Sequence, residues 1–116
     1  MKRGDIYWAT LLPRSGSEQS GRRPVIILSH DAFNQTPGWR SIIVVPVSTS
    51  VKQARRGPTV VALNAGTAGL PSESCAVCHQ ITTLDRAKLT DKIGALSYDA
   101  LTLVEQALLA AVDIRR

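Results

Sequence analysis

A polar, glycine-rich loop runs directly into an apolar strand over residues 14–29, and this junction constrains the fold more than any other part of the chain. Gly16 and Gly21 let the backbone bend at little steric cost, and Pro24 fixes the start of a run of β-branched residues typical of a buried strand. Arg23 is therefore expected at the mouth of a rigid strand. Guanidinium groups and glycine-rich backbone both suit phosphate, although a surface hairpin with solvated arginines explains the same residues.

The hydrophobic pattern of the rest of the chain predicts one mainly β (α+β) domain over residues 1–116. Ser97 can cap a C-terminal helix in which Leu101, Val104 and Leu108 recur at helical spacing. The apolar side of that helix either covers an open face of the sheet or forms a groove for a partner. Several short strands closed by a helix predict a small barrel-like sheet. Strands are expected at residues 5–11, 24–29, 41–48, 59–63, 74–84 and 92–95.

The length and charge of the chain limit its function. With 116 residues there is room for one core, and a formal net charge of +5 favours polyanionic partners, either nucleic acid or an acidic protein segment. Basicity alone does not establish nucleic-acid binding. Lys52, Arg55 and Arg56 lie in a stretch without any carboxylate between Asp31 and Glu73, so this segment is expected to form a positive surface.

Neither a membrane nor a metal is indicated. No apolar segment follows Lys2 and Arg3, and no run approaches the roughly 18 residues that span a bilayer, so a cytoplasmic protein is expected. Cys75 and Cys78 form a C-x-x-C beside His79, which invites a zinc or redox interpretation. Residues three apart on a strand point to opposite faces, however, so two reduced, half-buried thiols are expected and no metal or cofactor.

An ordered set of short motifs resembles the MazF/PemK family of toxin–antitoxin toxins. The resemblance runs from about residue 3 to the C-terminal helix, nearly the whole chain. It implies a sequence-specific, metal-independent endoribonuclease on a small SH3-like β-barrel, usually a homodimer, that is silenced by a cognate antitoxin. The motifs are Arg3-Gly-Asp-Ile-Tyr-Trp8, Gly16-Ser-Glu-Gln19, Arg23-Pro-Val25, Val45-Pro-Val47, Gln80-Ile81, Leu84-Asp-Arg86 and Leu89.

The resemblance places the catalytic groups on three residues. Cleavage without a metal uses the ribose 2′-OH as nucleophile and gives a 2′,3′-cyclic phosphate and a 5′-OH end, which requires a base, a stabiliser of phosphoryl charge and an acid. Arg23 matches the family's catalytic arginine and can act as an electrostatic clamp or an acid, since guanidinium stays protonated. Glu18 matches the glutamate of the family loop and either serves as the base or orients Arg23. The family's catalytic threonine falls on Ser48, a departure that leaves Thr49 as the alternative hydroxyl if the strand ends early.

Recognition is expected to use single-stranded RNA, because its bases can be splayed out and read on their edges. An acidic antitoxin segment is expected to compete for the same basic groove. Trp8 is predicted to lie in the core or a dimer surface, and Trp39 to stack or contact a partner. Two alternatives remain: a CcdB-like toxin that binds gyrase through its C-terminal helix, and a non-catalytic nucleic-acid-binding barrel. The expected RNA-binding residues are Gly16, Ser17, Gln19, Arg22, Thr49, Lys52, Arg55, Arg56 and Gln80.

Overall fold

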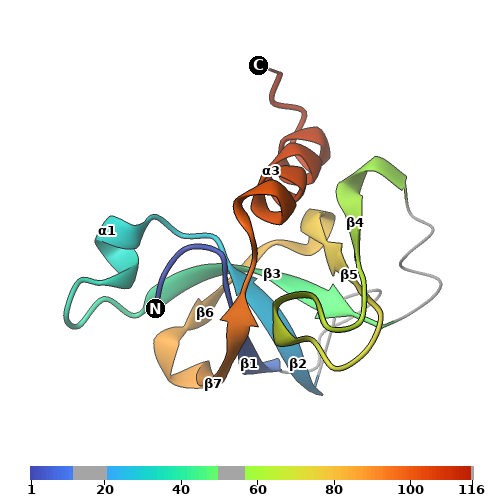
Figure 1. The fold of residues 1–116 in the computed structure, drawn as a ribbon. Helices are drawn as coiled ribbons and strands as arrows, with labels where there is room; N and C mark the ends of the chain where they lie inside the picture. The colour runs from blue at the N-terminus through green and yellow to red at the C-terminus, as the bar shows by residue number, and fades with distance from the viewer. Residues whose placement is uncertain (12–20, 50–56, 116) are drawn as a thin grey trace.

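The computed structural model describes residues 1–11, 21–49 and 57–115 as a twisted, mainly antiparallel sheet with one long helix (Figure 1). The strands are β1 (Asp5–Leu11), β2 (Gly21–Ile27), β3 (Ser41–Ser48), β4 (Val60–Leu63), β5 (Ser74–Val77), β6 (Thr82–Asp85) and β7 (Leu89–Ala95). The helices are α1 (Asp31–Asn34), α3 (Tyr98–Ala111) and four 3₁₀ turns, η1 (Gly57–Thr59), η2 (Thr67–Gly69), η3 (Cys78–Gln80) and η4 (Arg86–Lys88).

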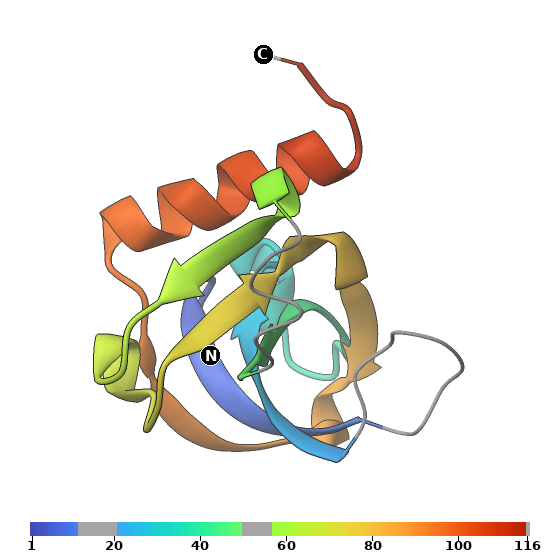
Figure 2. The same ribbon diagram turned by 90° about the vertical axis from the view of Figure 1, so that its right-hand side faces the viewer.

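The order of the strands in the sheet is β4-β5-β3-β2-β1-β7, with β6 also paired to β3. Strand β6 therefore pairs with the first half of β3, from Ser41 to Val44, β2 pairs with its middle, from Val44 to Pro46, and β5 pairs with its last two residues. Helix α3 begins after Ser97, whose hydroxyl accepts a hydrogen bond from the backbone N–H of Ala100, as the sequence predicted. Figure 2 shows α3 lying across one side of the sheet.

Two hydrophobic cores lie on opposite faces of the central strands. Ile26 of β2 belongs to the core under α3, together with Val104 of that helix. Val25 and Ile27 of β2 belong to the second core, together with Val44 of β3. All five side chains are fully buried. A strand buried on both faces reads as a continuous apolar run rather than an alternating one, which accounts for the sequence of β2. The α3 helix thus covers a sheet face, one of the two roles expected for it.

Strands β2 and β3 separate where two prolines occur. Their ladder runs from Ile27 opposite Val44 to Val25 opposite Pro46 and goes no further, and β3 then pairs with β5. Proline has no backbone N–H to donate to a ladder, so Pro24 and Pro46 weaken further pairing at this point. Residues 21–24 of β2 stay paired with β1. The separation opens a gap between the start of β2 and the end of β3.

The predicted SH3-like sheet with a C-terminal helix is confirmed, but the sheet is not closed into a barrel: β4 and β7 are the two ends of the strand order, and within the described residues no ladder joins them. The turn η2 fills this position instead. Ala68 and Gly69 have positive φ, which interrupts extended geometry and prevents pairing with β7. The backbones still approach closely, because a Cβ on Gly94 would lie 2.1 Å from the carbonyl oxygen of Ala68.

Several predicted boundaries also change. Strand β2 begins at Gly21 rather than at Pro24, so Arg23 lies within a strand instead of at its mouth. The single strand expected at residues 74–84 is two strands separated by η3, and β7 begins three residues before the expected 92–95. The segment 31–40, which Pro37 and Gly38 mark as turn-rich, begins with the four-residue helix α1. Bounds for β1 and β3 agree with the prediction.

The first of the family-like motifs has a structural role. The Nε of Arg3 donates to the backbone oxygen of Leu28 at 3.0 Å, and its guanidinium pairs with Glu105 of α3. Asp5, only 4% exposed, accepts a hydrogen bond from the backbone N–H of Lys2 at 2.8 Å. These contacts fasten the N-terminus to the end of β2 and to the helix.

The later Leu-Asp-Arg motif fastens another segment. The Nε of Arg86 donates to the oxygen of Trp39 at 2.8 Å, and Nη2 donates to the oxygen of Asn34 at 2.8 Å. Asp85 caps η4 through the backbone N–H of Ala87 and pairs with the guanidinium of Arg40 at 2.6 Å. The arginine at this position therefore holds the chain between α1 and β3 in place.

Candidate functional site

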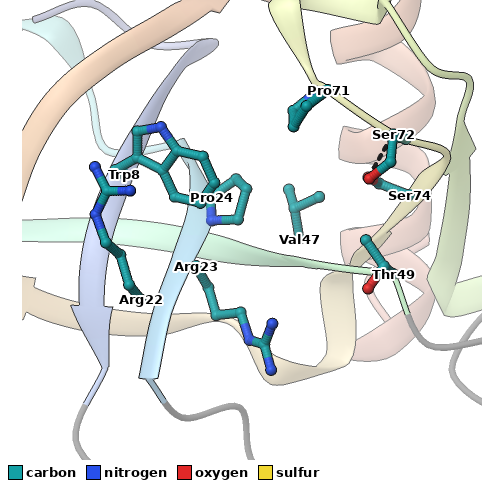
Figure 3. Close-up of a pocket in the computed structure, with 9 residues that line it drawn as sticks. All are labelled: Trp8, Arg22, Arg23, Pro24, Val47, Thr49, Pro71, Ser72 and Ser74. Atoms are coloured by element: carbon teal, nitrogen blue, oxygen red, sulfur yellow. Dashed lines mark hydrogen bonds between the residues drawn. The ribbon is translucent and has the colours of Figure 1, made fainter.

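A cleft of about 170 Å³ lies where β2 and β3 separate (Figure 3). One side is formed by β1 and the start of β2, and the other by the end of β3 and the segment leading into β5. The apolar rings of Pro24 and Pro71 lie on opposite sides of the cleft. The lining residues are Trp8, Arg22, Arg23, Pro24, Val47, Thr49, Pro71, Ser72 and Ser74.

Two adjacent arginines of β2 point in different directions from this cleft. The guanidinium of Arg22 lies over the ring of Trp8, 4.3 Å from its centroid, and pairs with Asp91 of β7 at 3.4 Å. Arg23 is exposed and pairs in register with Ala9, and in Figure 3 its guanidinium points away from Trp8. This alternation is the ordinary period of a strand. The guanidinium of Arg22 is thus held by Trp8 and Asp91, whereas the side chain of Arg23 extends from the strand.

Two neighbouring hydroxyls end β3. Ser48 is the last residue of the strand and only 5% exposed, whereas Thr49 is exposed and lines the cleft. Continuing the β2–β3 register past its last pair, Val25 opposite Pro46, would put Ser48 across from Arg23 and Thr49 across from Arg22. The end of β3 therefore places one hydroxyl, that of Ser48, opposite Arg23 and the other, that of Thr49, opposite Arg22.

The structure brings together three of the residues that the sequence singled out, Arg22, Arg23 and Thr49. Ser48 adjoins them but does not line the cleft. Gln80 lies half-buried in η3 and is not among the lining residues. The other predicted site residues lie outside the described residues: Gly16, Ser17, Glu18, Gln19, Lys52, Arg55 and Arg56.

Sequence reasoning missed the far wall of the cleft and gave Trp8 another role. Trp8 pairs in register with Pro24 and lies half-buried at the edge of the cleft rather than in the core. Parity gave no signal for the cleft, since Trp8 shares a strand face with Ile6, which is fully buried in the core. No local pattern identified Ser72 or Ser74, because only the pairing of β5 with β3 brings their segment to the cleft.

The expected stacking residue, Trp39, lies elsewhere. Its ring stacks on Phe33 with 4.7 Å between centroids, and its Nε1 donates to the backbone oxygen of Ser41 at 2.7 Å. Both aromatic side chains remain partly exposed. Trp39 is not a cleft-lining residue.

The two cysteines are buried structural residues. The thiol of Cys75 donates to the backbone oxygen of Ser48, and that of Cys78 to the oxygen of Val104 in α3. Burial raises the pKa of both thiols, that of Cys78 to about 11, which makes them poor nucleophiles and poor metal ligands. In the part of the chain that the structure describes, no three His, Cys, Asp or Glu side chains gather as a metal site would require.

Comparison with known proteins agrees with this geometry. A family model described as the PemK-like, MazF-like toxin of type II toxin–antitoxin systems matches residues 2–112. The chain is 37% identical to Endoribonuclease EndoA of Bacillus subtilis (strain 168), over 97% of each protein.

Solved structures show the same fold. The crystal structure of MazF from Deinococcus radiodurans superposes with a TM-score of 0.79 at 26% identity, covering 97% of this chain and 96% of that one. A mycobacterial endoribonuclease solved with its cognate antitoxin also gives 0.79, at 23% identity, over 100% of this chain and 98% of its own. No helix in the described residues is long and apolar enough to cross a membrane.

Proposed function

The chain belongs to the PemK-like, MazF-like family of type II toxins, and from this premise we propose that it is an endoribonuclease toxin that cleaves single-stranded RNA at specific sequences without a metal. One observation supports this function above the others. Arg23 extends from β2 directly beside the gap where two hydroxyls end β3, which is an arrangement suited to a phosphodiester.

The chemistry proceeds by transfer within the RNA. The ribose 2′-oxygen forms a bond to phosphorus, the bond from phosphorus to the 5′-oxygen breaks, and the products are a 2′,3′-cyclic phosphate and a 5′-OH end. The proton of the 2′-OH goes to a base, and the leaving oxygen receives a proton. Arg23 stabilises the charge that develops on the phosphoryl oxygens, since guanidinium binds phosphate as a planar fork. Glu18 is the base or the group that orients Arg23.

The two hydroxyls divide between the reacting phosphate and a neighbouring one. Ser48, in the register position across from Arg23, donates to a phosphoryl oxygen in the transition state. Thr49, on the side of Arg22, contacts the RNA backbone beside the reacting group. This assignment follows strand parity, because successive residues face opposite sides.

The remaining RNA-binding residues are assigned to the walls around this centre. Arg22 supplies a second positive charge, and the stretch without carboxylates that contains Lys52, Arg55 and Arg56 extends the basic surface. Electrostatic contacts of this kind weaken as salt rises. A cognate antitoxin with an acidic segment, expected from the family, occupies the same surface and thereby silences the toxin.

The active species is a homodimer in this proposal. Although β3 is strongly apolar, it can contribute little to the dimer surface, because most of its apolar side chains are buried within the chain. In the described part of the chain the exposed large hydrophobic side chains are Phe33, Trp39, Ile43, Tyr98, Leu103, Val112 and Ile114. Sedimentation at micromolar concentration measures the assembly, and a monomer would contradict it.

The decisive experiment is incubation of the purified protein with a defined RNA in EDTA, followed by mapping of the new 5′-OH ends. We expect cleavage at a short recurring sequence, undiminished by the chelator. Ends that carry a 5′-phosphate, or activity that requires added metal, would refute the mechanism. Gyrase inhibition without RNA cleavage would favour the CcdB-like alternative.

A further inference from the structure

The turn η2 and strand β7 meet in a backbone contact between residues 68–69 and 93–94, which is the seam of the open sheet (Figures 1 and 2). A Cβ on Gly94 would lie 2.1 Å from the carbonyl oxygen of Ala68, and a Cβ on Gly69 would lie 2.6 Å from the carbonyl oxygen of Ile93. A real Cβ comes no closer to such neighbours than about 3.0 Å. The contact is therefore reciprocal, and it forms only because both positions are glycine.

The β7 side of the seam is held by the sheet. Gly94 lies opposite Ile6 of β1 in register. Ile6 in turn lies opposite Ile26 of β2, and Ile26 lies opposite Val45 of β3. These three partners of the row are fully buried in the core under α3. Because protein interiors are close-packed, moving Gly94 would disturb the whole row, so a methyl group added there would displace η2 instead.

The turn η2 belongs to a braced connection between β4 and β5, residues 64–73. Within it the N–H of Gly66 donates to the backbone oxygen of Leu70 at 2.8 Å, and the side chain of Leu70 is buried in the core. The two ends of the connection are joined where Leu63 of β4 pairs with Ser74 of β5. A connection closed and braced in this way moves as one piece.

The same connection forms the far wall of the cleft. Pro71, Ser72 and Ser74 line that wall, and Pro71 lies across the cleft from Pro24 of β2 (Figure 3). Pro71 follows Gly69 by only two residues in the chain. A displacement of η2 away from β7 is therefore passed on to the wall that faces β2.

We propose that Gly94 is a positioning residue for the cleft: by letting η2 pack against β7, it sets the separation between the wall that carries Arg23 and the wall that leads to Ser48. The second wall reaches Ser48 because Cys75, next to the connection, pairs with Ser48 in register. The inference rests on the proposed function and adds to it a residue outside the cleft lining. Gly94 does not have a positive φ, so its own backbone accepts a side chain and the seam is what excludes one.

The reaction depends on this separation more than RNA binding does. An alanine at position 94 must move the carbonyl oxygen of Ala68 by about 1 Å, and a misplacement of about 1 Å can lower a rate as much as a hundredfold. Attraction between RNA and positive charges acts over roughly 10 Å and changes little with such a shift. We therefore expect Gly94→Ala to lower the single-turnover rate at saturating RNA by roughly tenfold to a hundredfold. The dissociation constant of RNA should stay within about threefold of the wild-type value.

Gly66 and Gly69 provide a matched pair of controls in and beside η2. Both have a left-handed φ, 88° and 81°, so alanine strains the backbone at either position. A Cβ on Gly69 meets Ile93 across the seam, whereas a Cβ on Gly66 would meet no atom of the described residues within 4 Å. Gly69→Ala should therefore lower the rate while Gly66→Ala leaves it unchanged. This comparison tests the seam even where Gly94→Ala does not fold.

Rates are compared at a temperature at which thermal unfolding shows that every variant is folded. Equal rate losses in Gly69→Ala and Gly66→Ala, or a wild-type rate in Gly94→Ala, would overturn the positioning role and leave the proposed function standing. A rise in the dissociation constant of RNA that accounts for the whole loss of activity would overturn it as well.

Crystal structures of the variants give a readout that does not depend on catalysis. The separation of Pro24 from Pro71 should increase by up to about 1 Å in Gly94→Ala or Gly69→Ala and remain at the wild-type value in Gly66→Ala. An unchanged separation in the seam variants would overturn the proposal. If the wild-type protein cleaves no RNA, the proposed function fails, and this separation alone then decides whether the seam positions the wall.

Discussion

Arg22 and Arg23 provide a matched pair for testing whether one guanidinium stabilises the transition state. Both are exposed residues of β2, and replacing either by glutamine changes the net charge equally, from +5 to +4. Only Arg23 extends beside the gap at the end of β3, while Arg22 is occupied by Trp8 and Asp91. The two substitutions therefore share their change in net charge and differ in their expected effect on the reaction.

The expected magnitudes follow from these positions. Losing one donor to a developing oxyanion costs about 2.7–4 kcal/mol, a factor of roughly 10² to 10³ in rate. Arg23→Gln should therefore lower the single-turnover rate at saturating RNA by two to three orders of magnitude. Arg22→Gln should lower that rate by less than about tenfold. Removal of one phosphate contact in Arg23→Gln should reduce the slope of log K against log salt by about 0.7, and Arg22→Gln should reduce it by less.

The assay combines single-turnover cleavage in EDTA with binding measured over a range of salt concentrations. Thermal unfolding serves as the control for folding, since exposed substitutions usually change stability by no more than about 0.5 kcal/mol and the lost cation–π contact of Arg22 adds about 0.5–1. Wild-type cleavage by Arg23→Gln would refute the mechanism. Equal rate losses in the two variants would show that charge alone, and not the position of Arg23, matters.

Four further predictions concern the two hydroxyls, Cys78 and Gly94. Ser48→Ala should slow single-turnover cleavage roughly tenfold to a thousandfold while Thr49→Ala mainly raises KM; the reverse order would exchange their roles. Burial raises the pKa of Cys78 to about 11, so iodoacetamide should alkylate the native protein at pH 8 far more slowly than the urea-unfolded chain. Stability should also fall as pH rises from about 9 to 11, because the unfolded chain then binds fewer protons than the folded one; stability unchanged over this range would contradict it. Gly94→Ala places a Cβ 2.1 Å from a backbone oxygen of η2 and should lower the free energy of unfolding, measured by urea titration, by about 1–3 kcal/mol. Gly38→Ala is the control and should cost less, because only its positive φ opposes a side chain. Equal losses in the two variants would mean that the close approach at Gly94 is relieved without strain.

The parts of the fold that could be predicted from the sequence are those whose signal is local. The bounds of β1 and β3 follow from β-branched and apolar runs, and the start of α3 follows from the capping residue Ser97. The start of β2 was predicted too late because Pro24 was read as its first residue. Proline is tolerated inside β2 because the ladder with β3 ends at Val25, so no strand on that side needs the N–H that Pro24 lacks. The position of this ladder end depends on β3 and cannot be read from the proline itself.

The break in the predicted strand 74–84 has a similar cause. Strand β5 pairs with the end of β3 and β6 with its start, but the two ladders are out of register. Ala76 lies opposite Val47 and Thr82 opposite Val44, so the segment between them has three extra residues, which η3 accommodates. No turn residue marks this break in the sequence. That the barrel-like sheet stays open could not be predicted for a related reason, since the positive φ at Ala68 belongs to a residue type that gives no warning of it.

For the candidate site, charge and motif spacing identified Arg22 and Arg23, but the far wall required the tertiary structure. Trp8 illustrates the difference, because an aromatic residue in a half-buried strand is more often core than ligand surface. Its exposure to a cleft depends on β3 separating from β2, an event set by two prolines more than fifteen residues away from it in the chain.

The same separation connects the fold with the proposed activity. In a continuous ladder, backbone pairing would occupy the space between the start of β2 and the end of β3, and no cleft would remain between them. Because the pairing stops at Pro46, the two strand ends hold side chains across a gap while both strands remain anchored, β2 to β1 and β3 to β5. Rigid strand ends position catalytic groups more accurately than loops do. The sheet therefore holds the backbones of Arg23 and Ser48 in place, and in the proposed mechanism the neighbouring segments determine which RNA sequence reaches these two side chains.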